Sequence, residues 1–206
     1  MNADRSLFAA LVLWLAWGLI SVTSVAVAAK SSSAEGLCRT LIDQFLRSPT
    51  AGHLSAMQDS QRGDCWSVIL LNQIQRLDHL IAAGNTPSAT LLAPHVRNLD
   101  GGELEDALRA FGQYASHHMP EFVSSPIGGA LTDREFADAL TMLPLDLSDQ
   151  YDAQLAEMRV RRLALEQTSM PKFQGRKETA LASIDAFIAE IDRARLSVGP
   201  QTLGAH

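Results

Sequence analysis

The chain has 206 residues, of which 47% are hydrophobic and 6% aromatic, and its formal net charge is −6. This length suits one domain with its own core, and the acidic balance argues against binding to nucleic acid or anionic lipid. Alanine and leucine are abundant and aromatic residues few, which favours helices over strands. No stretch alternates apolar and polar residues convincingly, so the sequence predicts an all-α protein.

The first 28 residues have the composition of a secretory signal. Arg5 precedes an uncharged apolar run, Leu7–Ala29, and this run contains Ala26-Val27-Ala28, which fits the A-x-A cleavage pattern. We therefore expect residues 1–28 to be a signal peptide and the mature protein to be periplasmic or secreted. The alternative is an uncleaved membrane anchor, because a run of this length can span the roughly 30 Å hydrocarbon core of a bilayer.

The mature chain contains two cysteines, Cys38 and Cys65. In an oxidising compartment two cysteines most simply pair, so the sequence predicts a disulfide between them. The alternative is a catalytic thiol at Cys65. A reactive thiol requires an electropositive setting, which the neighbouring Asp64 opposes.

Changes in composition divide the rest of the chain. Residues 29–36 are small and polar and predict a flexible lead-in, and residues 199–206 predict a loose tail. Between them we expect a single all-α domain over residues 37–198. Its first helix begins at Leu37 and ends before Pro49.

The strongest amphipathic pattern predicts a central helix that follows a polar loop over Thr50–Gly63. Asp64 is its expected N-cap, and the Gly84-Asn85 pair ends it. The apolar residues recur at helical spacing and are expected to face the core: Trp66, Ile69, Leu70, Ile74, Leu77, Leu80 and Ile81. Three polar residues are placed on the opposite side: Arg76, Asp78 and His79.

Two segments, Pro94–Leu108 and Pro126–Leu140, align without gaps at a period of 32 residues. Each contains a helix-start pattern in which an N-cap residue, Asp100 or Thr132, is followed three residues later by glutamate. A helical unit with a period in the thirties is typical of HEAT-like or TPR-like α-α repeats, although no family consensus is present. The alternative is convergence, because any two amphipathic helices share apolar spacing and caps.

The same spacing predicts the remaining helices. The two repeat units predict helices over Gly101–His118, closed by Pro120, and over Asp133–Leu143. Two longer helices are expected over Asp149–Thr168 and Arg176–Leu196, with a short connection that suits an antiparallel hairpin. The expected fold is a stack of helical hairpins with some solenoid character.

No motif specific to a class of catalysis is present, since G-x-S-x-G, HExxH and phosphate-loop patterns are absent. The best metal-ligand candidates are His117, His118 and Glu121, whose side chains suit zinc. Adjacent residues of a helix do not face one another, however, and His118 falls on an apolar stripe. We therefore expect no metal or cofactor. An enzyme or metal-binding protein with a site around these three residues is the alternative.

A short basic cluster is formed by Arg159, Arg161 and Arg162. Such a run is usually a solvated face with carboxylate neighbours, and it is also a candidate contact for an acidic partner. Without a catalytic constellation, the sequence favours a non-enzymatic protein-interaction module over an enzyme. Its expected partner is an unknown protein of the cell envelope, and an inhibitor or immunity-like protein is the concrete form of this hypothesis.

Overall fold

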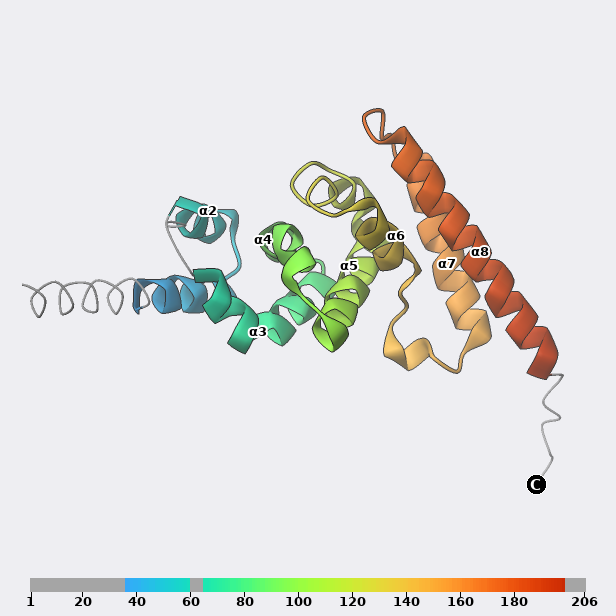
Figure 1. The fold of residues 1–206 in the computed structure, drawn as a ribbon, viewed down its shortest axis with the longest axis horizontal. Helices are drawn as coiled ribbons and strands as arrows, with labels where there is room; N and C mark the ends of the chain where they lie inside the picture. The colour runs from blue at the N-terminus through green and yellow to red at the C-terminus, as the bar shows by residue number, and fades with distance from the viewer. Residues whose placement is uncertain (1–35, 60–64, 199–206) are drawn as a thin grey trace, which may run out of the picture.

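The computed structural model describes residues 36–59 and 65–198, with the side chains of residues 65–71 left out (Figure 1). Within these ranges the regular structure is helical and no strand is found, so the all-α prediction is confirmed. The predicted signal peptide, most of the lead-in, the N-cap Asp64 and the tail lie outside the described residues. After a helical stretch at 36–47, the elements are α2 Ala51–Asp59, α3 Cys65–Ala82, α4 Thr86–Leu92, η1 Ala93–Asn98, α5 Gly101–Phe122, α6 Asp133–Thr141, η2 Leu145–Leu147, α7 Tyr151–Gln167 and α8 Gln174–Val198.

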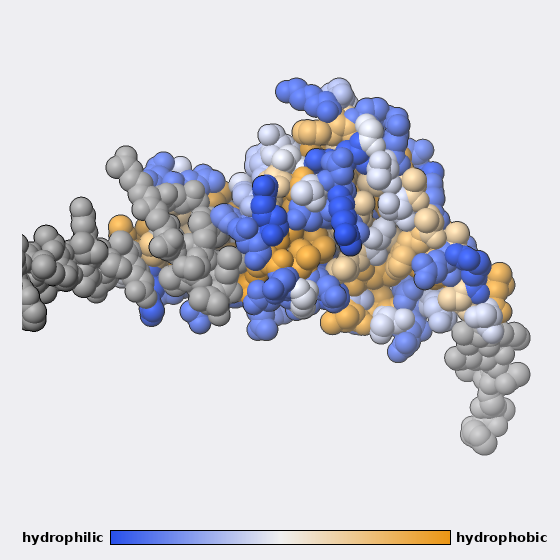
Figure 2. Space-filling model, in the orientation of Figure 1, coloured by the Kyte–Doolittle hydropathy of each residue, from blue (hydrophilic) through white to orange (hydrophobic). Residues whose placement is uncertain are grey.

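The helices follow one another along the long axis of the molecule (Figure 1). The largest packing interfaces join α3 to α5 and α7 to α8, and α6 contacts both α5 and α8. α7 and α8 form the antiparallel hairpin predicted for the C-terminal end, with boundaries within about two residues of those expected. Polar residues cover most of the face seen in Figure 2, and apolar patches are exposed near its middle.

Two hydrophobic clusters hold these helices together. The larger cluster runs from α3 to α8 and includes Tyr114, Phe122 and Phe136, all fully buried. The smaller cluster lies at the N-terminal end and consists of Ile42, Phe45, Leu46, Leu54, Met57, Leu77 and Leu91. Helix α3 contributes to both clusters, which agrees with the prediction that it is central.

The prediction of a loop over Thr50–Gly63 is wrong for residues 51–59, which form α2. The backbone amide of His53 donates to Oγ1 of Thr50 at 3.3 Å, which satisfies one of the free donors at the helix start. Leu54 and Met57 lie about one turn apart and are buried in the smaller cluster. Only two apolar anchors fix this helix, so the amphipathic pattern in the sequence is weak.

Residues 86–98, for which no helix was predicted, form α4 and η1. Gly84 has φ of +89°, a conformation that glycine adopts without strain, and it ends α3 as expected. Asn85 then starts α4, because its side chain accepts the backbone N–H of Ser88 at 2.9 Å. One dipeptide thus ends one helix and begins the next.

Helix α5 extends beyond the predicted end at His118 and includes Pro120. The chain is kinked at His118, whose φ of −131° and ψ of 39° are not helical. Proline removes an amide donor and crowds the preceding turn, which accounts for a break just before it. Pro120 therefore redirects the last turn rather than ending the helix.

The two proposed repeat units agree in the burial of one pair of equivalent leucines but not in capping. Leu108 and Leu140 are both buried, as the alignment requires. Thr132 forms the predicted capping box, since the backbone amide of Glu135 donates to its side chain and its own amide donates to the glutamate. Asp100 makes no capping hydrogen bond with its side chain. A true internal repeat remains a prediction.

Truncation of either equivalent leucine tests the shared packing. Leu108→Ala and Leu140→Ala should each reduce the free energy of unfolding by about 2–5 kcal/mol, because each leaves a cavity in the larger cluster. Urea unfolding followed by circular dichroism measures this. Leu163→Ala is the matched control on the exposed face of α7 and should change stability by less than about 0.5 kcal/mol. An equally small effect at Leu108 would contradict equivalence of the two units.

No helix in the described ranges combines the length and apolar character needed to cross a membrane. The apolar run Leu7–Ala29 lies outside those ranges.

Candidate functional site

The most unusual group in the described part of the chain is the carboxylate of Asp78 on α3. Only 9% of this residue is exposed, and neither carboxylate oxygen has a hydrogen-bond partner. The prediction that Asp78 lies on the solvent side of its helix is therefore wrong, whereas Arg76 and His79 are exposed. The reason is that α3 is covered twice, by the smaller cluster and by α5, and Asp78 falls under α5.

The sequence around Asp78 contains a signal for this burial. Asp78 lies four residues after Ile74 and three before Ile81, and both isoleucines belong to the larger cluster. Residues at these spacings share one face of a helix. A carboxylate placed between two core residues on such a face predicts a buried acid.

Asp78 lines a groove of about 530 Å³ between α3, α5 and the connection that contains η2. Residues at helical spacing form the two helical walls, Gln75, Asp78, His79 and Ala82 from α3 and Asp106, Arg109, Ala110 and Gln113 from α5. The third side consists of Pro144, Leu145 and Asp146. The groove thus collects three aspartates from three different elements.

The pKa of the Asp78 carboxyl is raised from 3.8 to about 7, mainly by burial and additionally by the negative charges of Asp106 and Glu103. Arg109 makes no hydrogen bond to Asp78, since its guanidinium is engaged elsewhere. Its Nη1 donates to Asp106 Oδ1 at 2.5 Å and its Nε donates to the carbonyl of Leu143 at 3.1 Å. Near neutral pH the groove therefore contains a carboxyl that readily gains or loses a proton.

The three arginines of the predicted basic cluster do not form one exposed surface. Arg161 is 0% exposed, so it cannot serve as the partner contact that the sequence suggested. Arg162 is held on the surface by Asp185 at 2.6 Å and Glu166 at 3.0 Å, and Arg159 is exposed. The prediction of a solvated basic cluster is therefore wrong at its central residue.

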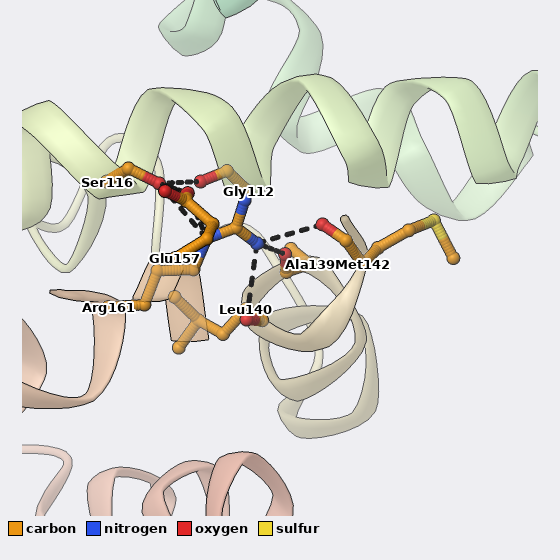
Figure 3. A network of polar contacts seen from close by, with 7 residues as sticks. All are labelled: Gly112, Ser116, Ala139, Leu140, Met142, Glu157 and Arg161. Carbon is orange, nitrogen blue, oxygen red and sulfur yellow. Dashed lines mark hydrogen bonds and ion pairs between the residues drawn. The ribbon is translucent and has the colours of Figure 1, made fainter. Parts of the chain in front are cut away.

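Arg161 instead joins three helices (Figure 3). Its Nη1 donates to the carbonyls of Ala139, Leu140 and Met142, at 3.4, 3.3 and 2.8 Å, which lie at the C-terminal end of α6. Its Nε donates to Glu157 Oε1 at 2.9 Å and to Ser116 Oγ at 3.0 Å, and Ser116 also hydrogen-bonds to Glu157. The side chain of Arg161 thus caps free carbonyls at the end of α6. These hydrogen bonds account for the burial of a charged side chain at this position.

The candidate metal ligands differ in exposure: His118 is half-buried, whereas His117 and Glu121 lie on the surface. His118 stacks on Tyr114 with ring centroids 4.9 Å apart, and its Nε2 lies 2.7 Å from where a Cβ on Gly84 would be. Across residues 36–59 and 65–198, no three His, Cys, Asp or Glu side chains are grouped so as to hold a metal ion. His118 therefore packs at the α3–α5 junction.

Cys38 lies half-buried on the helical stretch 36–47, and the side chains that the structure describes include no free thiol. The side chain of Cys65 is outside the description, although its backbone begins α3. The pairing of the two cysteines remains a prediction.

Comparison with known proteins gives no match, since no family model, curated protein or solved structure is significantly similar to the chain.

Proposed function

We propose that the protein is a non-enzymatic, α-helical interaction module of the periplasm or the cell exterior, and that the groove at Asp78 contacts its partner protein. The observation that carries this proposal is the buried carboxylate without a hydrogen-bond partner. Burying such a group costs stability, and native proteins satisfy most of their buried polar atoms. Groups held in this state, with a perturbed pKa and beside a groove, are concentrated at functional sites.

The surroundings of Asp78 favour binding of a protein surface. Asp106 and Asp146 extend the negative charge of the groove, and a net charge of −6 attracts basic partners over longer distances. Leu145 is 67% exposed at the edge and offers an apolar contact beside these charges. An acidic groove with an apolar edge suits an inhibitor or immunity-like protein that covers a basic site on its target.

Charge reversal at the rim tests this proposal. Asp146→Lys should remove the partner from affinity captures of the tagged protein from its own cell envelope, because it places a positive charge beside the contact. Asp149→Lys is the matched control, since Asp149 is exposed on the same connection but does not line the groove. Equal recovery of the partner with both variants, or no partner enriched by the wild-type protein, would contradict the proposal.

The proposed compartment has a separate test. Intact-mass measurement on protein recovered from the envelope should give an N-terminus at Ala29 or Lys30, from cleavage after Ala28 or Ala29. Recovery of the uncleaved chain in the membrane fraction would establish the anchor instead. Recovery from the cytoplasm would contradict both the signal peptide and the proposed place of action.

We also propose that Cys38 and Cys65 form a disulfide that joins the helical stretch 36–47 to the start of α3. Reduction should lower the free energy of unfolding by about 3.5 kcal/mol while leaving helix content largely intact, because the bond acts mainly on the unfolded chain. Urea unfolding with and without reductant measures this, and a variant with serine at both positions should not respond to reductant. Two reactive thiols in the oxidised, folded protein would exclude the bond and reopen Cys65 as a nucleophile.

A further inference from the structure

We infer that the groove binds the guanidinium group of an arginine side chain on an exposed segment of the partner, with Asp78 as its counter-ion. This inference rests on the proposed function and adds the chemistry that the groove recognises. It follows from the unpaired oxygens of Asp78, the charges that surround them and the apolar surfaces beside them.

The first argument is the missing donor. Both oxygens of Asp78 are buried and unpaired, and a carboxylate with two unpaired oxygens matches the parallel N–H groups of a guanidinium. The arginines of α3 and α5 do not supply this donor. Arg76 donates to the carbonyl of Leu46 at 3.1 Å, and Arg109 is held by Asp106 and Leu143. The protein therefore presents the acceptor half of an ion pair.

The second argument is the charge around Asp78. The titratable and charged groups that line the groove or raise the pKa of Asp78 are His79 from α3, Glu103, Asp106 and Arg109 from α5, and Asp146 from the connection. Carboxylates outnumber cations in this set, and Arg109 is paired with one of them. A groove of this composition concentrates cations and disfavours anions.

The third argument is the apolar part of the groove. Ala82, Ala110 and Pro144 line it together with the exposed Leu145. An arginine side chain buries its methylene stem along such surfaces while its charged end reaches a carboxylate. Both oxygens of Asp78 are shielded from solvent, so entry of the guanidinium requires movement of the side chains around them.

Binding of a cation should depend on pH. A guanidinium favours the ionised carboxylate, and with a pKa of about 7 Asp78 is mostly protonated at pH 6 and mostly ionised at pH 8. We therefore expect arginine binding to strengthen about tenfold between these two values.

The probe is the peptide acetyl-Gly-Leu-Arg-Leu-Gly-amide, titrated into the isotope-labelled protein from the envelope and followed by NMR. Saturable shifts should appear in α3, α5 and residues 144–146 at pH 8. The citrulline peptide, which has nearly the same shape without the charge, should bind at least about tenfold more weakly. Asp78→Asn should weaken arginine binding similarly and abolish its pH dependence, whereas Asp185→Asn, on α8 and outside the groove, should behave as the wild type.

Three results would overturn the inference: equal binding of the citrulline peptide, wild-type affinity in Asp78→Asn, or shifts that map away from the groove. Equal binding of a third peptide, with lysine in place of the arginine, would overturn the assignment of a guanidinium. Circular dichroism confirms that Asp78→Asn is folded. If the peptide fails to bind but capture of the partner still depends on Asp146, the proposed function stands and only this inference fails.

Discussion

Replacement of Arg161 by methionine is expected to destabilise the protein by about 3–5 kcal/mol. The change removes the donors for three carbonyls at the end of α6 and leaves the half-buried Glu157 without its cation. Methionine fills much of the same space, so the effect reports lost hydrogen bonds and charge rather than a cavity. Helices α5 and α6 are already in close contact beside this site, since a Cβ added to Gly112 would lie 2.3 Å from the carbonyl of Ala139. They therefore cannot move closer together to compensate for the lost side chain.

Urea unfolding at pH 7 measures the effect. Arg159→Met, which removes an exposed arginine two residues earlier on the same helix, is the control and should change stability by less than about 0.5 kcal/mol. The double variant Arg161→Met with Glu157→Gln should recover part of the loss, since it also removes the charge left unpaired. A loss below about 1 kcal/mol in Arg161→Met would contradict a stabilising role for the network.

Asp78→Asn is expected to stabilise the protein at pH 8 by up to about 4 kcal/mol. The pKa of Asp78 is raised from 3.8 to about 7 on folding, so the folded state binds the proton more tightly than the unfolded state. The resulting stabilisation is fully present below pH 3.8 and is lost as the pH rises toward 7. An upward shift of this size corresponds to about 4 kcal/mol. Asparagine cannot ionise and should avoid this loss.

Unfolding at pH 4.5, 6 and 8 tests the sign. The advantage of the asparagine variant should be small at pH 4.5, grow through pH 6 and level off above pH 7. Asp185→Asn, which removes an exposed partner of Arg162, should show no such growth. An advantage that is constant with pH would mean that Asp78 titrates normally, and it would remove the physical basis for the groove as a binding site.

Much of the fold was predictable because the relevant information is local. Helices α3, α6, α7 and α8 have apolar residues at helical spacing, and their ends have recognisable caps or proline. The short helix α2 was missed because it is fixed by tertiary contacts of Leu54 and Met57 rather than by a periodic stripe. The kink at His118 does not follow from the sequence alone, because a proline can either end a helix or bend it.

The candidate site was less predictable, for a physical reason. A charged side chain is expected to be exposed unless another helix packs over it. The sequence does not show which faces of α3 and α7 are covered by other helices. The sequence places Asp78 and Arg161 on solvent-facing sides of their helices, but both are buried. In each case the charged residue lies between buried apolar residues on the same face of its helix. This pattern indicates a buried charged side chain.

The division of the core into two clusters has a consequence for hydrogen exchange. The helical stretch 36–47 and α2 are held mainly by the smaller cluster, which α3 joins through Leu77 and α4 through Leu91. This end can open as a separate unit while the larger cluster stays closed. Its amides should therefore exchange through an opening that is less costly than global unfolding, whereas the amides of α5 should exchange only when the whole domain unfolds. Helix α3, which belongs to both clusters, marks the boundary between the two regimes.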